Sequence, residues 1–347
     1  MHVPSTKLEW QEAADSRQAG VKPVLEVKDL HVSYYTDAGR AKALDGVSLS
    51  LNPGEKLGLV GESGAGKSTM ALAMMRMIKP PGRVEHGQVI VDGTDLMALT
   101  KDQMLKARLS RIAYIPQGAM NSLNPVLRIG AQMIDSIKAH SSNSSPSEMK
   151  ERCLHALQAV DLRPGVFQMY PHELSGGMKQ RVCIAIGILL EPKVIVADEP
   201  TSALDVVTQR QVIDTIDRVR EQLGAAVILI GHDMGLMAQF VDKVAVFYAG
   251  RLMELCTVYE MFTNAKHPYA RALIDSLPNL NNKSHFQGIP GMAPALLRLP
   301  SGCAFHPRCS RAMDICHTTR PVTEVQGDHV VTCHLYPEQT DTQAKHD

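Results

Sequence analysis

Aromatic residues are scarce in this 347-residue chain, where Phe, Tyr and Trp together make up 4% and tryptophan occurs once. Net charge is also lacking, because 36 lysine and arginine residues balance 36 aspartate and glutamate residues. Sequence-independent nucleic-acid binding needs surplus positive charge, and single-strand binding uses aromatic rings on which bases stack. The composition therefore argues against a nucleic-acid-binding protein.

Long apolar runs are missing as well. No run reaches the roughly 18 residues that a membrane-spanning helix needs, and the longest candidate, Cys183 to Leu190, is cut by Glu191-Pro192-Lys193. The polar residues 1–22 contain no uninterrupted apolar segment of the signal-peptide kind and predict a loose leader. Seven cysteines, an odd number, fit a reducing compartment better than a disulfide framework. We therefore expect a cytosolic protein whose contact with a membrane is peripheral or through a partner.

The strongest motif present is a phosphate-binding loop between Lys56 and Thr69. It satisfies the pattern G-x-x-x-x-G-K-[ST] between a predicted strand at 57–60 and a predicted helix at 70–78, which we expect Pro80 and Pro81 to stop. Glycines let the backbone N–H groups point at phosphate oxygens, and the helix N-terminus adds positive charge. We expect Lys67 to reach the β- and γ-phosphates of ATP, and Ser68 or Thr69 to offer a hydroxyl to Mg²⁺. The predicted loop contacts are Gly61, Ser63, Gly64, Gly66, Lys67, Ser68 and Thr69.

Short apolar or alternating runs predict the remaining strands, at 24–32, 47–51, 88–91, 112–117, 194–197, 227–230, 244–248 and 251–254. Helices are predicted at 148–160, 182–190 and 206–222, and the segment from Gln117 to about Tyr170 looks mostly helical. The serine-rich stretch 141–147 predicts a flexible surface loop. The chain is therefore expected to be an α/β protein.

Two adjacent acids follow the continuous apolar run 194–197, which is typical of a strand buried on both faces of a parallel sheet. Ligands bind at the carboxyl ends of such strands, and buried acids are costly unless they meet a cation or take part in chemistry. We expect Asp198 to hold Mg²⁺ through water and Glu199 to orient and polarise the attacking water. The alternative is a solvated strand end. His232 ends the strand at 227–230, and we expect it to contact the γ-phosphate rather than to be structural.

A second anion site is predicted in the segment Leu174 to Arg181. The backbone N–H groups of Ser175, Gly176 and Gly177, together with the dipole of the following helix, could face a phosphate. The alternative interpretation is an ordinary helix start.

The order and spacing of these motifs resemble the ATP-binding subunits of ABC transporters over roughly residues 24–262. The resemblance implies a P-loop NTPase with a RecA-like core, an antiparallel β subdomain and a helical subdomain at about 118–170, within an ATPase domain at 23–262. It also implies that two subunits pair head to tail. Each ATP then lies between one phosphate loop and the partner's segment equivalent to Ser175–Gly177, and closure and opening drive a membrane partner.

The same resemblance implies individual residue roles. Gln117 is similar to the lid residue that senses Mg²⁺ and touches the membrane partner, Tyr34 matches the adenine-stacking position, and Ser202 to Asp205 matches a loop at the nucleotide site. The implied catalytic residues are Glu199, His232 and Gln117. The implied Mg²⁺ ligands are Ser68, Gln117 and Asp198.

Three further segments resemble the dipeptide and oligopeptide importer branch, which also includes nickel and some oligosaccharide importers. They are Asn121 to Pro125, His267 to Leu273 and Gly302 to Cys309. The branch implies peptide uptake at the cytoplasmic face of the inner membrane, with a homologous second ATPase subunit, two transmembrane permease subunits and an extracytoplasmic solute-binding protein. It usually has Asp-Pro where Gly118-Ala119 stand here. A soluble ABC ATPase acting on nucleic acid is the alternative, but such proteins commonly carry two ATPase units or a long coiled coil.

Four of the seven cysteines, Cys303, Cys309, Cys316 and Cys333, gather in a predicted C-terminal domain at 263–347. Spacings of five, six and sixteen intervening residues are wider than those usual within zinc pairs. The residues alone leave an iron–sulfur cluster, zinc and plain reduced thiols open. His306, His317 and His334 are close enough in sequence to be alternative ligands, but we expect them to be surface or loop residues. Similarity to the importer branch, some members of which carry a [4Fe–4S] cluster here, favours the cluster.

Overall fold

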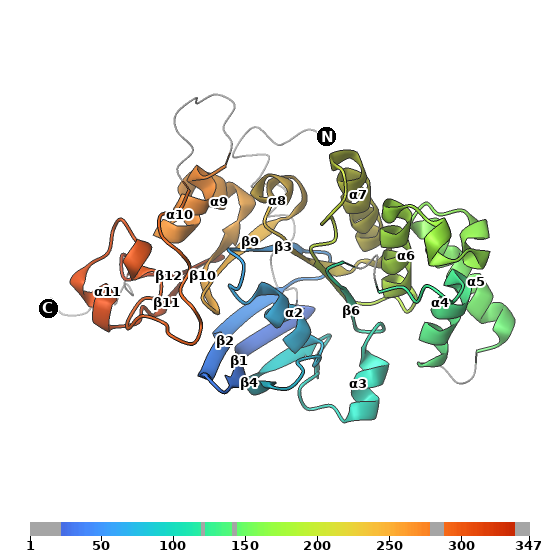
Figure 1. Cartoon of the computed structure of the whole chain (residues 1–347), viewed down its shortest axis with the longest axis horizontal. Coiled ribbons are helices and arrows are strands. Elements are labelled where there is room, and N and C mark those ends of the chain that lie inside the picture. Colours follow the sequence, from blue (N-terminus) through green and yellow to red (C-terminus); the bar gives the residue numbers. More distant parts are fainter. Residues whose placement is uncertain (1–21, 119–121, 141–143, 278–287, 337–347) are drawn as a thin grey trace, which may run out of the picture.

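Two β-sheets and their covering helices form the body of the protein (Figure 1). The computed structural model describes residues 22–118, 122–140, 144–277 and 288–336. The predicted leader, except Lys22, lies outside these ranges, as do Ala119 and residues 141–143 of the predicted serine-rich loop. Among the described residues, no helix combines the length and the apolar composition needed to cross a bilayer.

The smaller sheet is antiparallel, with the strand order β2-β1-β4-β5. Its strands are β1 (Leu25–Thr36), β2 (Gly39–Leu51), β4 (Gly82–Val91) and β5 (Thr94–Asp95). The strands predicted at 24–32, 47–51 and 88–91 are confirmed, but each observed strand is longer. The added residues are mostly polar, small or aromatic, and they include the buried Ala43 and Leu44, so the apolar alternation marks only part of each strand.

The larger sheet has the order β11-β12-β10-β9-β3-β8-β7-β6 and is parallel from β9 to β6. Its strands are β3 (Lys56–Val60), β6 (Ile112–Ile115), β7 (Val194–Asp198), β8 (Ala226–Ile230), β9 (Lys243–Tyr248), β10 (Arg251–Thr257), β11 (Thr323–Gln326) and β12 (His329–Thr332). Every residue of β7 and β8 is buried, as expected for strands covered on both faces. The predicted strands and the hairpin between β9 and β10 are confirmed.

Helix α2 (Lys67–Met74) lies between the two sheets and packs against both β2 and β7. The predicted end at Ile78 is wrong, because Arg76 adopts a left-handed conformation with φ 48° and the helix has already stopped at Met74. The prolines at 80 and 81 therefore follow a turn rather than end the helix. Both core clusters of the protein meet the larger sheet, one on each face.

Most of the other helices flank the larger sheet or form an arm at the β6 edge (Figure 1). The other helices are α3 (Lys101–Ala107), α4 (Ile129–Lys138), α5 (Pro146–Ala159), α6 (Gly176–Ile188), α7 (Val206–Leu223), α8 (Met234–Phe240), α9 (Val258–Asn264), α10 (Pro268–Asp275) and α11 (Asp314–Thr318). Helix α5 starts at a capping box in which Ser145 and Glu148 bond each other's backbone N–H groups. The prediction for α7 is confirmed within one residue.

Two helix predictions in the arm are wrong. The described residues 122–128 and 160–173 are coil, turns or short 3₁₀ segments, because Pro125, Pro164 and Pro171 disfavour helical backbone in the residues before them. Helix α6 begins at Gly176 rather than Val182, since the Ser175 hydroxyl accepts the Met178 N–H and both glycines enter the first turn.

The C-terminal segment joins the larger sheet through pairing of β12 with β10. Glu254 on β10 is fully buried and accepts three bonds at its carboxylate. Its donors are the backbone N–H of Lys266 at 2.8 Å, the backbone N–H of His267 at 2.7 Å and Nε2 of His329 at 2.7 Å. One buried carboxylate thus connects β10, the start of α10 and β12.

Candidate nucleotide site

Two glycines give the phosphate loop its shape. Gly61 has φ 142°, and a Cβ there would lie 2.2 Å from the Phe247 carbonyl oxygen. Gly66, the N-cap of α2, has φ 106°, and a Cβ there would lie 2.6 Å from the Ala43 carbonyl oxygen. Only glycine tolerates such backbone angles and such close approach to β9 and β2. Ser63 and Gly64 are exposed, and Thr69 is half-buried in α2.

Lys67 points back into this loop. Its Nζ donates to the carbonyl oxygens of Gly61 at 2.7 Å and Glu62 at 3.0 Å, and its side chain is buried. Burial lowers the pKa of Lys67, while the nearby carboxylates, foremost Glu199 and Asp198, oppose that shift. The ammonium group is therefore held within the loop by backbone oxygens.

Asp198 is buried at the end of β7, and its carboxylate accepts hydrogen bonds from two hydroxyl groups. The Ser68 hydroxyl donates to Oδ1 at 3.2 Å, and the Tyr114 hydroxyl donates to Oδ2 at 3.0 Å. Burial raises the pKa of Asp198, and the two hydroxyl bonds oppose this. A hydroxyl and a carboxylate side by side are the hard oxygen donors that Mg²⁺ prefers, so the pair fits the predicted metal site. The role of Tyr114 was not predicted, although it lies in a predicted strand.

The Glu199 carboxylate contacts the other two residues predicted to be catalytic, Gln117 and His232. The carboxylate accepts a hydrogen bond from Nε2 of Gln117 at 2.5 Å and forms an ion pair with Nε2 of His232 at 2.7 Å. Gln117 follows β6, Glu199 follows β7 and His232 follows β8, and these strands are neighbours in the sheet. Because the carboxyl ends of parallel strands share one edge, residues far apart in the chain converge there.

The backbone of Glu199 is unusual. Its φ of 46° lies in the left-handed region, which non-glycine residues rarely adopt. Its N–H still donates to the Ile230 carbonyl oxygen at 2.9 Å, so the pairing with β8 continues through this residue. Such strain, about 1–3 kcal/mol, is retained at sites where the surrounding structure fixes the conformation.

The predicted second anion site lies on other elements. Ser175 is the N-cap of α6, and Asp205 is the N-cap of α7, whose Oδ1 accepts the Thr208 N–H at 3.0 Å. The two helix starts are close, since a Cβ on Gly177 would lie 2.6 Å from Cγ2 of Thr208. Across the part of the chain that the structure describes, no hydrogen bond or ion pair joins Ser175–Gly177 or Asp205 to the phosphate loop. Tyr34 lies half-buried on β1, opposite Gly82.

Glu62, inside the phosphate loop, is held by the C-terminal segment. The hydroxyl of Tyr269 accepts its backbone N–H at 2.9 Å. The guanidinium of Arg308 donates to both carboxylate oxygens, at 2.6 and 2.8 Å, and also to the Tyr248 hydroxyl at 3.2 Å. Its hydrogen bonds, first to Glu62, raise the pKa of Arg308 against the effect of burial. These contacts were not predicted, because nothing in the local sequence relates Arg308 to the loop.

The four C-terminal cysteines line one small cavity, together with His267 and His334. A close backbone contact fixes two of them, since the Cys303 N–H donates to the Cys316 carbonyl oxygen at 2.9 Å. Burial, and secondarily the neighbouring thiols, raise the pKa of Cys303 and bring the pKa of Cys333 to about 11. His306 also lines this cavity, and its ring packs on that of His317 at 4.4 Å between centroids.

Phe305 links this cavity to the phosphate loop. Its ring is buried and lies 5.2 Å from both Tyr248 and Tyr269, measured between centroids. Such edge-to-face and tilted pairs add about 0.5–1.5 kcal/mol each beyond the area they bury. Because Tyr248 and Tyr269 contact Arg308 and Glu62, the cysteine segment and the loop form one packed unit.

Comparison with known proteins gives matches along most of the chain. The model of the ABC transporter family matches residues 44–202, and that of the oligopeptide/dipeptide transporter C-terminal region matches residues 253–316. The dipeptide transport ATP-binding protein DppD of Caldanaerobacter subterraneus is 42% identical over 91% of this chain and 98% of its own length. The oligopeptide transport ATP-binding protein OppD of Escherichia coli is 40% identical over 89% of this chain and 92% of its own.

Solved structures agree with these matches. The dimeric structure of the ATP-binding cassette MJ0796 in a post-hydrolysis state, bound to ADP and Pi, superposes with a TM-score of 0.60 at 27% identity. The alignment covers 67% of this chain and 98% of that one.

Proposed function

The chain belongs to the family of dipeptide and oligopeptide transport ATP-binding proteins, and on that premise we propose that the site around Lys67, Asp198 and Glu199 binds and hydrolyses ATP to energise peptide import. The fold is that of an ABC ATPase cassette, and the protein is an ATPase subunit of a peptide importer. The observation that carries the site assignment is the convergence of Gln117 and His232 on the Glu199 carboxylate.

The residues divide the chemistry among them. The phosphate loop and Lys67 bind the triphosphate, and Ser68 and Asp198 offer oxygens to Mg²⁺, which neutralises phosphate charge. Glu199 orients a water molecule for attack on the γ-phosphorus and polarises it. His232 would contact the γ-phosphate, and Gln117, which donates to Glu199 in this structure, would offer its amide oxygen to Mg²⁺. The bond that breaks joins the β–γ bridging oxygen to the γ-phosphorus, giving ADP and phosphate. Tyr34 stacks on the adenine.

A second ATPase subunit completes the site. Ser175, Gly176, Gly177 and Asp205 stand at the starts of α6 and α7 and, among the described residues, share no hydrogen bond or ion pair with the phosphate loop of their own chain, which suits them to a nucleotide held by a partner. The dimeric form of the related cassette supports such pairing. We propose that the partner is a homologous rather than an identical chain, and that the pair works with two permease subunits and an extracytoplasmic solute-binding protein at the cytoplasmic face of the membrane.

Reconstitution tests this function. The chain, co-purified with its permease pair and partner ATPase in lipid vesicles, is expected to hydrolyse ATP faster when the solute-binding protein and a dipeptide or tetrapeptide are added. Vesicles should accumulate the radiolabelled peptide with ATP but not with a non-hydrolysable analogue. Stimulation by nucleic acid instead, or uptake that is equal with the analogue, would overturn the proposal. Nickel and an oligosaccharide serve as competing solutes, and preference for either would replace peptide as the cargo.

We also propose that Cys303, Cys309, Cys316 and Cys333 hold a [4Fe–4S] cluster in a C-terminal domain at 263–347. Their gathering around one cavity supports this. A single zinc ion, at about 2.3 Å from each thiolate, would draw the sulfurs to about 3.8 Å from one another. Among the described residues, these thiols form no group of three within 4.8 Å of one another.

The surroundings of the cavity fit the same group. His267 is fully buried, its Nδ1 accepts the Tyr269 N–H at 3.0 Å, and its Nε2 is buried without a hydrogen-bond partner. Cluster sulfurs commonly accept hydrogen bonds of this kind. The cluster would cross-link the loop-rich segment that carries Phe305 and Arg308, and thereby hold both residues against the phosphate loop.

A further inference from the structure

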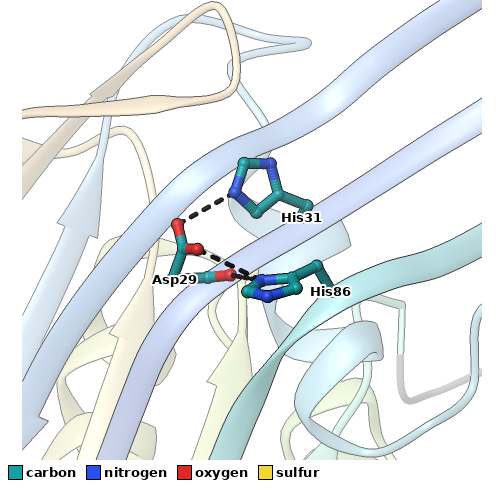
Figure 2. Close-up of side chains that lie close together, drawn as sticks. All are labelled: Asp29, His31 and His86. Atoms are coloured by element: carbon teal, nitrogen blue, oxygen red, sulfur yellow. Dashed lines mark hydrogen bonds and ion pairs between the residues drawn. The ribbon is translucent and has the colours of Figure 1, made fainter.

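A second group of metal-ligating side chains lies on the antiparallel sheet, in a different part of the molecule from the cysteine cavity. Asp29 and His31 belong to β1, and His86 belongs to β4. Nε2 of His31 lies 2.9 Å from Oδ1 of Asp29, and Nδ1 of His86 lies 3.1 Å from Oδ2 of the same carboxylate. One donor atom from each residue lies within 4.8 Å of the other two. Figure 2 shows the Asp29 carboxylate facing both rings.

Irregular backbone brings the three side chains together. His31 is the register partner of His86, and the pairing of β1 with β4 shifts on both sides of His31. Asp29 has φ 47°, and Gly87 has φ 111°, where a Cβ would lie 2.6 Å from the Asp29 carbonyl oxygen. Bulges of this kind re-aim side chains and are found next to functional sites.

The spacing suits one small cation. Zinc lies about 2.0–2.2 Å from imidazole nitrogen and carboxylate oxygen, so ligands on a tetrahedral ion are about 3.3 Å apart. The two nitrogen–oxygen distances, 2.9 and 3.1 Å, are those of a hydrogen bond and an ion pair and lie slightly below that value, and Nδ1 of His86 is also 3.2 Å from the Asp29 carbonyl oxygen. The side chain of His86 is 68% exposed, which leaves an entry path and room for water as a fourth ligand.

The other ring nitrogen of His31 faces a carboxylate, which is a usual partner of metal-bound histidines. Its Nδ1 lies 3.5 Å from Oδ1 of Asp45, whose side chain is 5% exposed. Arg251 at 2.5 Å and Arg320 at 3.0 Å hold that carboxylate in place. At its ion-pair distance from His31 the Asp45 carboxylate favours the ring orientation in which Nε2 faces Asp29, and such a partner raises the basicity of a ligating imidazole. This contact is independent of the three ligands and points to the same use of Nε2.

We propose that Asp29, His31 and His86 form a binding site for a divalent transition-metal ion. Two imidazoles and one carboxylate select zinc, nickel, copper or cobalt, whereas Mg²⁺ and Ca²⁺ prefer all-oxygen sets. The bound ion joins β1 to β4 at the point where their pairing is irregular. The ion is also connected to the C-terminal segment, because Asp45 lies next to His31 and forms an ion pair with Arg320.

Cobalt titration of the full chain tests the site, because Co²⁺ absorbs differently with thiolate and with nitrogen and oxygen ligands. Apart from any signal of the C-terminal cysteines, the wild-type protein is expected to bind Co²⁺ with visible d–d bands that lack a thiolate-to-metal charge-transfer contribution, in the presence of excess Mg²⁺. His86→Gln should weaken that binding by at least about 10–100-fold, the range that loss of even an outer partner costs. Its exposed side chain makes a folding defect unexpected, and thermal unfolding without metal should match the wild type.

His155→Gln is the matched control, since His155 is an exposed histidine on α5 and should leave the binding unchanged. Metal should also raise the unfolding temperature of the wild type and of His155→Gln, but not of His86→Gln. Three results would overturn the proposal: no Co²⁺ binding outside the thiols, equal affinity in His86→Gln, or displacement of Co²⁺ by millimolar Mg²⁺.

Discussion

Arg308 and Glu62, which are 246 residues apart in the sequence, form a bidentate salt bridge with nitrogen–oxygen distances of 2.6 and 2.8 Å. Glu62 lies within the phosphate loop, and Arg308 directly precedes Cys309 in the cysteine segment. The pair places a positive charge on a carboxylate that lies, with Asp198 and Glu199, close to the Lys67 ammonium group. The C-terminal segment is thereby built into the nucleotide site.

Arg308→Gln is expected to weaken ATP binding by about tenfold, which corresponds to a repulsion of about 1.4 kcal/mol. The physical reason is that Glu62 would then repel the triphosphate. Titration with a fluorescent ATP analogue measures the affinity. The double variant Glu62→Gln/Arg308→Gln should recover most of it, whereas a merely structural role of Arg308 predicts no recovery. Arg298→Gln, an exposed arginine of the same segment, is the control.

Glu199→Gln should keep ATP affinity and slow hydrolysis by about 10²–10⁴, the usual contribution of a general base. The amide retains the shape of the carboxylate but cannot polarise the attacking water. Single-turnover hydrolysis measures the chemical step, and Glu221→Gln on the exposed face of α7 is the control. Normal turnover in Glu199→Gln would exclude this residue as the base.

Lys67→Ala should weaken nucleotide binding itself by tenfold or more, because charge-assisted phosphate contacts are each worth about 1.5–3 kcal/mol. Equilibrium binding of labelled ATP in the presence of Mg²⁺ measures the loss. Lys79→Ala changes an exposed lysine beyond the end of α2 and should bind as the wild type does. Equal affinity in both variants would contradict the assigned phosphate loop.

Protein purified without oxygen is expected to be brown and to contain about four iron and four sulfide per chain. Cys316→Ala should lose the colour and most of the iron. Cys153→Ala removes a buried thiol from α5, far from the cavity, and should keep both. Zinc alone, or no metal in the wild type, would refute the cluster.

Acid should destabilise the protein through His267. Burial lowers the pKa of His267 to about 4, although the Glu254 carboxylate opposes the shift. An unfolded histidine has a pKa of about 6.5, so the unfolded chain binds the extra proton between these values and stability falls as pH falls from about 6.5 to 4. The full effect is about 3 kcal/mol.

Urea unfolding at pH 7 and pH 4.5 measures this contribution. His267→Asn keeps an acceptor for the Tyr269 N–H but does not titrate, so it should lose about 2–3 kcal/mol less than the wild type between the two pH values. His155→Asn should follow the wild-type profile. Parallel profiles for all three proteins would show that His267 carries no titration.

Much of the nucleotide site could be predicted from short segments of sequence. The phosphate loop, the Asp198-Glu199 pair and His232 each sit at the end of an apolar strand, and the strand–loop order alone predicts that they share one edge of a sheet. The strands of the parallel sheet were predictable for the same reason, since continuous apolar runs mark burial on both faces. Helix boundaries were less predictable at Met74 and Gly176, because a left-handed residue and a serine cap decided them.

Sequence by itself determined what depends on neighbours along the chain: the strand and helix periods, the glycines that the loop requires, and the kind of chemistry at each strand end. Tertiary structure alone decided which distant side chains meet. The Arg308–Glu62 pair, the Tyr114–Asp198 bond and the group of Asp29, His31 and His86 join elements whose approach depends on sheet order, bulges and packing. No local pattern encodes such contacts, because the free energy that forms them comes from burial in the whole fold.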